Sequence, residues 1–246
     1  MPKIDIPFVD LGGENEEFHD EILKSISAII KSGSYILGKN IDEFEKSVCK
    51  KLGTEFCVGL NSGGDALMLG LIALNLSKDS NIVVPANSFI ASAWAVVNSG
   101  LNLNYCDVSE DMNASAKNFQ DASNTNTAGW MPVHLTGSPC DINSFKASEL
   151  KGIKIIEDAA QAFGASFDEV KIGSWGEFSG FSLNPLKVLG VIGDGGFLAT
   201  NNEKIANKVR LLRNHGMHKR DDTSCWGFNS RLDEIQAKIA SIKLKK

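Results

Sequence analysis

Several features that would point to a particular class of protein are missing from this 246-residue chain. No apolar run approaches the length of a membrane-spanning helix, and the stretch from Met1 to Asp10 lacks the long apolar core of a signal peptide. The net charge of -5 offers no basic surface for nucleic acid or an anionic membrane. We therefore expect neither nucleic acid nor a membrane as a partner.

Cysteine and histidine are also scarce. The five cysteines are scattered and form no Cys-x-x-Cys pair, which argues against a disulfide framework or a zinc site. His215 and His218 have a spacing compatible with two metal ligands on a helix, but no third ligand is evident, and a pair of loop histidines is the simpler interpretation. We expect no metal and a reducing, cytoplasmic location.

The rest of the chain alternates between helical and strand patterns. This alternation predicts an α/β fold with a mostly parallel central sheet and helices on both faces. In such sheets the functional groups collect in loops at the carboxyl ends of strands. We expect strands at 82–84, 101–106, 129–134, 153–156, 180–182 and 196–200, helices at 18–32, 42–52, 65–76, 90–98, 202–212 and 230–243, and polar loops at 109–127 and 215–224.

The first candidate segment is the turn Ser62, Gly63 and Gly64 before a strongly apolar helix. Glycines that open a helix expose backbone N–H groups at the positive end of the helix dipole, which suits a phosphate. The segment lacks the Lys-Ser/Thr of a Walker loop and the glycine spacing of a dinucleotide site. A simple tight turn before a helix explains it equally well.

The second candidate is Asp158, which follows an apolar strand and precedes two alanines. Small residues let a flat ligand approach, and the carboxylate could bind a protonated ring nitrogen, a metal or a ribose. The alternative is an ordinary helix N-cap.

The third candidate is Lys187, which lies among apolar neighbours in a loop between two strands. Burial of that kind favours the uncharged amine that a nucleophilic lysine needs. The alternative is an exposed surface lysine.

Together the three segments supply a phosphate cradle, a carboxylate and an amine. Pyridoxal phosphate needs these groups, because its phosphate must be anchored, its ring nitrogen kept protonated, and its aldehyde bound to a lysine. Their order along the chain resembles the large domain of fold-type-I pyridoxal phosphate enzymes.

Eight ordered motifs make the resemblance more specific. The chain resembles the DegT/StrS family of pyridoxal-phosphate-dependent nucleotide-sugar aminotransferases over nearly its whole length. The motifs are 6–11 (IPFVDL), 32–38 (SGSYILG), 84–92 (VPANSFIAS), 132–137 (PVHLTG), 157–162 (EDAAQA), 193–196 (GDGG), 213–216 (RNHG) and 227–237 (GFNSRLDEIQA).

This resemblance implies roles for individual residues. Lys187 would hold the cofactor as a Schiff base and shuttle a proton, and Asp158 would pair with the ring nitrogen. The other implied cofactor contacts are Gln161 to the phenolic oxygen, Phe89 stacked on the ring, Ser62, Gly63, Gly64 and Ser182 at the phosphate, and Asn229 at the phosphate of a neighbouring subunit. Tyr35 and His134 are candidate substrate contacts.

The implied reaction moves an amino group, with glutamate as the expected donor, to a nucleotide-linked keto-sugar for surface glycan biosynthesis. The resemblance also implies a homodimer with shared active sites. Three residues depart from the family pattern: Gly64 replaces a usual Thr, Val188 a frequent Asn, and Phe163 a frequent His. These departures put cofactor affinity in doubt.

The expected organisation is one pyridoxal-phosphate-binding large domain over 1–246, with an N-terminal helical segment and without the family's usual smaller C-terminal domain. Exposed apolar surface is expected where that domain would pack. Two alternatives remain open. A dehydratase of the same family would carry His at the position of Lys187, which argues against it. A truncated, catalytically impaired paralogue would bind cofactor or a partner without turnover.

Overall fold

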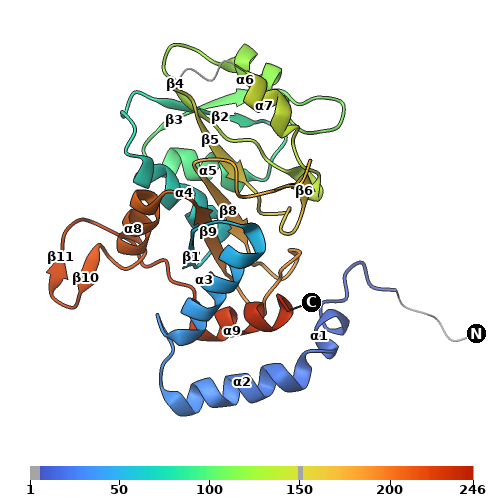
Figure 1. Cartoon of the computed structure of the whole chain (residues 1–246), viewed down its shortest axis with the longest axis vertical. Coiled ribbons are helices and arrows are strands. Elements are labelled where there is room, and N and C mark those ends of the chain that lie inside the picture. The colour runs from blue at the N-terminus through green and yellow to red at the C-terminus, as the bar shows by residue number, and fades with distance from the viewer. Residues whose placement is uncertain (1–5, 149–151, 246) are drawn as a thin grey trace, which may run out of the picture.

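The computed structural model describes residues 6–148 and 152–245, so the two ends of the expected unit 1–246 and residues 149–151 lie outside this range. Its centre is a sheet with the strand order β1-β9-β8-β5-β4-β2-β3 (Figure 1). Strand β9 pairs antiparallel with both neighbours, and the other pairs are parallel, which confirms a mostly parallel sheet. The strands are β1 (Phe56–Leu60), β2 (Asn81–Pro85), β3 (Asn102–Cys106), β4 (Thr127–Trp130), β5 (Lys154–Asp158), β8 (Phe178–Ser182) and β9 (Gly196–Thr200).

Helices and two small hairpins surround this sheet. The hairpins are β6 (Ser166–Phe167) with β7 (Val170–Lys171) and β10 (Met217–Lys219) with β11 (Asp222–Thr223). The helices are α1 (Gly13–Glu16), α2 (His19–Ser32), α3 (Lys39–Leu52), α4 (Gly63–Leu74), α5 (Ile90–Asn98), α6 (Ala116–Ala122), α7 (Ile142–Ala147), α8 (Glu203–Leu212) and α9 (Glu234–Lys243), with a short 3-10 turn at Leu135–Gly137.

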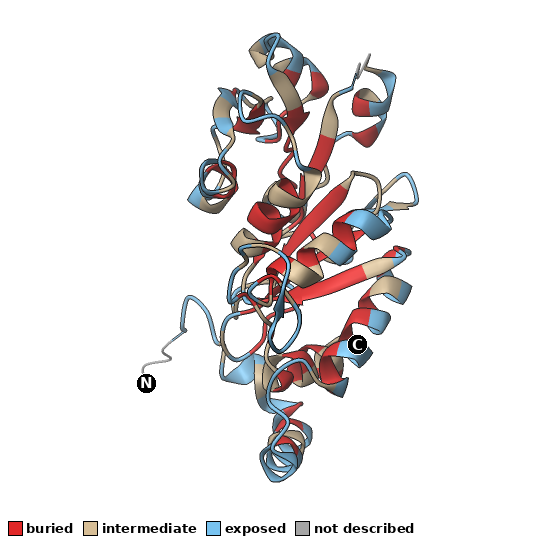
Figure 2. Cartoon of the chain, turned by 90° about the vertical axis from the view of Figure 1, so that its left-hand side faces the viewer, coloured by how far each residue is buried: buried red, intermediate tan, exposed pale blue. Residues whose placement is uncertain are grey.

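Buried side chains alternate between the two faces of the sheet. In β9, Phe197 and Ala199 pack with residues of α2, α3 and α9, whereas Leu198 packs with residues of α4, α5 and α8. This period of two is what a strand covered on both faces requires. Figure 2 shows the buried residues concentrated along the strands and the helix surfaces turned toward them. The expected helices on both faces are therefore confirmed.

The sequence patterns missed several elements. Strand β1 was not predicted because it is short and contains Gly59. The expected loop 109–127 contains α6, which begins at a capping box between Ser115 and Asn118. Helix α7 was not expected, and the loop 215–224 contains the β10–β11 hairpin.

Two boundaries also differ from the prediction. The expected strand 129–134 is β4, which ends at Trp130, just before Pro132. The expected helix 230–243 begins at Glu234, because the Asp233 carboxylate caps it by accepting the N–H of Gln236. Among the described residues, no helix is both long and apolar enough to span a bilayer.

Candidate active site

A cavity of about 580 Å³ opens at the carboxyl ends of β5 and β8, beside the N-termini of α4 and α5. Its position is the one expected for function in a sheet of this kind. Eight of the eleven residues predicted for the site line it: Ser62, Gly63, Gly64, Phe89, Asp158, Gln161, Ser182 and Lys187.

The N-terminus of α4 forms one wall of the cavity. Ser62 caps the helix, because its Oγ accepts the N–H of Asp65 at 3.1 Å. A side chain at Gly63 would clash, since its Cβ would lie 2.9 Å from the Cβ of Ser182. At Gly64 a Cβ would meet only ordinary contacts, the nearest being a Trp94 ring atom at 3.6 Å. The predicted glycine-opened helix is thus present, and its free N–H groups can receive an anion.

Asp158 ends β5 and faces the cavity, although its residue surface is only 6% exposed. Its Oδ2 accepts the Ser92 hydroxyl at 2.5 Å, and its Oδ1 accepts the N–H of Ala160 at 3.2 Å. Burial raises the pKa of this carboxyl, and the hydrogen bonds from Ser92 and Ala160 and the charges of His134 and Lys187 oppose that rise. No helix begins here, so the helix-cap interpretation is wrong.

A buried carboxylate of this kind needs a cationic partner. In the part of the chain that the structure describes, no ion pair to Asp158 is present. A protonated ring nitrogen in the cavity would supply the missing charge. The surroundings of Asp158 therefore fit a pyridine-type cofactor.

Lys187 lies half-buried in the loop that joins β8 to β9. Its N–H donates to the carbonyl of Asn184 at 2.8 Å, which closes a tight turn. Helix α9 braces the same loop, because the Gln236 amide oxygen accepts the N–H of Ile192 and the Lys243 ammonium donates to the carbonyl of Gly190 at 2.6 Å. The amine is thus carried on a tight turn, in a loop that α9 holds just after the lysine.

Gln161 and Phe89 complete the walls. The Gln161 amide oxygen accepts the N–H of Thr136 at 2.7 Å, which leaves its –NH₂ group to donate toward a ligand. Phe89 precedes α5 and is 70% exposed, so one ring face is open for stacking.

Three predicted residues do not line the cavity. Asn229 pairs with Asn214 through an isolated bridge, and Tyr35 donates its hydroxyl to the carbonyl of Ile30. His134 is completely buried, which leaves its ring no surface for a substrate. Its Nδ1 accepts the N–H of Cys140 at 3.1 Å, and its backbone N–H donates to the carbonyl of Asp158. His134 therefore supports the strand that carries Asp158.

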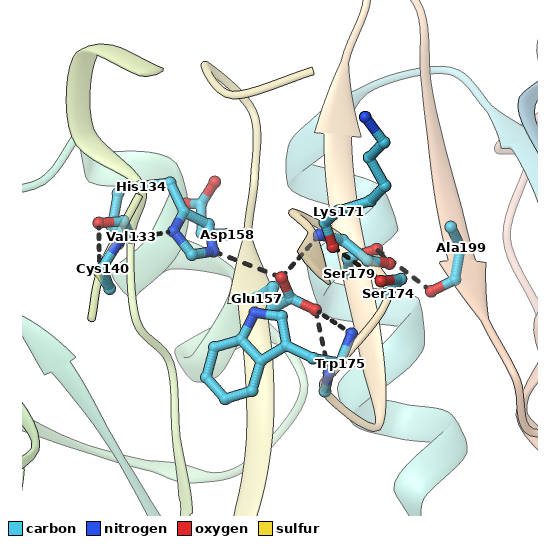
Figure 3. A network of polar contacts seen from close by, with 12 residues as sticks. Val133, His134, Cys140, Glu157, Asp158, Lys171, Ser174, Trp175, Ser179 and Ala199 are labelled. Carbon is cyan, nitrogen blue, oxygen red and sulfur yellow. Dashed lines mark hydrogen bonds and ion pairs between the residues drawn. The ribbon is translucent and has the colours of Figure 1, made fainter. Parts of the chain in front are cut away.

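Behind the cavity, Glu157 anchors the loop that follows the β6–β7 hairpin (Figure 3). Its carboxyl accepts three backbone N–H groups, from Gly173 at 2.6 Å, Gly176 at 2.9 Å and Trp175 at 3.1 Å. The Nε2 of His134 lies 3.4 Å from Oε2 but outside hydrogen-bond geometry. This side of β5 is a closed structural network.

Sequence reasoning missed other cavity residues, among them Ser88, Trp94, Asn184 and Asp194. It also missed Ser92, whose hydroxyl lies behind Asp158. Ser88 lies before α5 and Ser92 lies in its first turn, so their spacing in the sequence did not predict that the two hydroxyls meet. Among the described residues, no cluster of three or more His, Cys, Asp or Glu side chains is placed to hold a metal ion.

Comparison with known proteins agrees with this geometry. Residues 16–246 match the model of the DegT/DnrJ/EryC1/StrS aminotransferase family. The dTDP-3-amino-3,6-dideoxy-alpha-D-galactopyranose transaminase of Aneurinibacillus thermoaerophilus is 38% identical over 242 residues, which are 97% of this chain and 66% of that protein.

Two solved structures share the fold closely. The crystal structure of S. venezuelae DesV in complex with a ketimine intermediate has a TM-score of 0.95 and 35% identity, and the match covers 99% of this chain and 66% of DesV. The structure of NtdA from Bacillus subtilis with bound cofactor PMP has a TM-score of 0.89 and 29% identity, over 99% of this chain and 57% of NtdA. The chain thus spans up to about two-thirds of each of these proteins. The matched family model and the site geometry together show that this chain belongs to the DegT/DnrJ/EryC1/StrS aminotransferase family.

Proposed function

We propose that the protein is a pyridoxal-phosphate-dependent aminotransferase that delivers an amino group to a nucleotide-linked keto-sugar. One observation carries the proposal: a single cavity gathers a glycine-opened helix N-terminus, a buried carboxylate that forms no ion pair within residues 6–148 and 152–245, and the Lys187 amine. Family membership and the names of the relatives, one of which is a dTDP-amino-sugar transaminase, support the substrate class.

Each wall of the cavity has a part in holding the cofactor. The N–H groups at the start of α4, with the hydroxyls of Ser62 and Ser182, would hold the phosphate. Asp158 would pair with the ring nitrogen and keep it protonated. Gln161 would donate to the phenolic oxygen, and Phe89 would stack on the ring. Pyridoxal phosphate, when bound, supplies an electron sink for bond changes at the amine-bearing carbon.

Lys187 would do the proton chemistry. In the first half-reaction its Nζ would accept the proton from the amine-bearing carbon of the donor. The amino group of the donor would pass to the cofactor, and water would supply the carbonyl oxygen of the keto acid that leaves. In the second half Lys187 would return a proton to the sugar carbon that gains the amine, while the carbonyl oxygen of the sugar leaves as water. The bracing of its loop by α9 would keep Nζ within reach of both carbons.

The finer parts of the proposal rest on the sequence resemblance. We expect glutamate as the amino donor, a role in surface glycan biosynthesis, and a homodimer in which Asn229 reaches the neighbouring subunit's phosphate. Because all five cysteines are free thiols, we keep a cytoplasmic location as part of the same proposal.

The test uses the visible spectrum of the purified protein. With pyridoxal phosphate, the wild type should show an absorption band that Lys187→Ala lacks, and added glutamate should bleach that band. Absence of a lysine-dependent band would refute the proposed function. A band that forms but resists glutamate and a panel of other amino acids would favour the impaired paralogue, which binds cofactor without turnover.

A further inference from the structure

Two serine hydroxyls form a chain behind the Asp158 carboxylate. Ser92, in the first turn of α5, is completely buried, and its Oγ lies 2.5 Å from Oδ2 of Asp158. The Oγ of Ser88 lies 2.6 Å from that of Ser92, and Ser88 lines the cavity. This hydrogen-bonded chain of two hydroxyls thus runs from the buried side of the Asp158 carboxylate to the cavity.

The number of protons sets the direction of these hydrogen bonds. An ionised carboxylate only accepts, and each serine has one proton to donate. When Asp158 is ionised, Ser92 must therefore donate to Asp158, and Ser88 must donate to Ser92. When Asp158 is protonated, this order breaks, because Ser92 can then receive the carboxyl proton instead. The Ser88 hydroxyl also lies 3.2 Å from the carbonyl oxygen of Phe89, which can accept its proton when Ser88 does not donate to Ser92.

We propose that Ser92 is a positioning residue that holds the Asp158 carboxylate ionised and aimed at the ring nitrogen of the cofactor, with Ser88 ordering the Ser92 hydroxyl. This inference rests on the proposed function, because it concerns the same cofactor. Ser92 itself is not among the residues that line the cavity and acts through Asp158.

The groups around Asp158 leave the stabilisation of its ionised carboxylate to an uncharged donor, the hydroxyl of Ser92. Burial raises the pKa of Asp158, and the Ser92 hydrogen bond comes first among the influences that lower it. The titratable groups nearby are His134 from the segment after β4, Lys187 from the β8–β9 loop, Glu157 on the reverse side of β5, and Asp194 at the cavity wall. None of them forms an ion pair with Asp158 in the described part of the chain.

The experiment compares Ser92→Ala with wild type for two ligands: pyridoxal phosphate and its 1-deaza analogue, in which carbon replaces the ring nitrogen. A charge-assisted hydrogen bond is lost, so pyridoxal phosphate should bind about ten- to a hundredfold more weakly to Ser92→Ala. The 1-deaza analogue has no ring nitrogen to hold, so its affinity should change less than about twofold. Ser88→Ala should show a smaller loss of the same kind.

Ser179→Ala is the matched control. Ser179 is also completely buried, but its hydroxyl donates only to the carbonyls of Gly173 and Ala199. This variant should leave the ratio of the two affinities unchanged. Equal weakening of both ligands by Ser92→Ala, or no weakening of either, would overturn the proposal.

A second measurement needs no cofactor. With ¹³C-labelled aspartate, the Asp158 carboxyl of the ligand-free protein should titrate at a higher pH in Ser92→Ala than in wild type, and Ser92→Thr should restore the wild-type titration. An unchanged titration would overturn the role of Ser92 even if the variant binds poorly. If wild type lacks a lysine-dependent band, the proposed function fails, but this titration still reports on Ser92 and Asp158.

Discussion

Glu157 and Asp158 are adjacent carboxylates at the end of the same strand, and both are buried, yet their surroundings differ sharply. Glu157 points to the closed side of the sheet and accepts three backbone N–H groups from the loop at 173–176. Asp158 points to the cavity and accepts one N–H and one hydroxyl. The alternation of a strand thus turns two neighbouring acids into a structural anchor and a site for a cation.

The largest expected effect is on stability and comes from Glu157. Glu157→Ala would remove the acceptor of the buried Gly173 N–H and of the partly buried Trp175 and Gly176 N–H groups, which should cost about 3–5 kcal/mol of unfolding free energy. Urea denaturation of the ligand-free protein measures this. If Glu157→Ala stays as stable as wild type, the assignment of Glu157 as an anchor is wrong.

The corresponding substitution at the neighbouring carboxylate, which faces the cavity, is Asp158→Asn. It removes the charge and nearly keeps the shape, so pyridoxal phosphate should bind about a hundredfold more weakly because the ring nitrogen loses its counter-charge. The ligand-free variant should be at least as stable as wild type, since it no longer buries an unpaired charge. Spectroscopic titration and urea denaturation read the two outcomes separately. If Asp158→Asn is strongly destabilised but binds pyridoxal phosphate normally, Asp158 has a structural role and the assignment of Asp158 to the cofactor is wrong.

Two adjacent glycines offer a contrast of the same type. At Gly64 a side chain meets only ordinary contacts, whereas at Gly63 it would press on Ser182. Gly64→Thr restores the residue usual in the family pattern and adds a hydroxyl at the helix N-terminus, so pyridoxal phosphate should bind about three- to tenfold more tightly. Gly63→Ala should bind it more weakly than wild type. Equal effects of both substitutions on affinity would refute the assigned cradle.

The smallest expected effect concerns pH. Burial raises the pKa of Asp158 above its ordinary value of 3.8, so the folded state holds this proton more tightly than the unfolded chain does. The stability contributed by this group is therefore complete below about pH 4 and is lost as pH rises through the folded pKa. In ligand-free protein, the stability of Asp158→Asn relative to wild type should increase over that range. A constant difference would show that Asp158 titrates normally.

The sequence predicted most of the candidate residues that the structure places around one cavity, because these residues lie at junctions between strands and helices. Lys187, Asp158 and the turn before α4 follow recognisable breaks in hydrophobic pattern, and parallel strands bring such junctions to one edge. The Ser92 contact could not be predicted, since it joins residues that are distant in sequence and depends on the packing of α5. Likewise, the sequence places both His134 and Asp158 at or just after the end of an expected strand, but only the structure shows the His134 ring buried against Cys140 and Glu157.

The reversed strand β9 has a consequence for how the protein folds. It is close in sequence to β8, but its other partner is β1, where Phe56 lies opposite Thr200. Nearby segments pair with less loss of chain entropy than distant ones, so we expect β8 and β9 to pair before β1 docks. Only then does Gly196 meet Ser62 and Gly63, which completes the cradle. A cofactor that contacts both the N-terminus of α4 and Lys187 would bind only after these two parts of the protein have come together. Its binding would therefore stabilise the folded state by mass action.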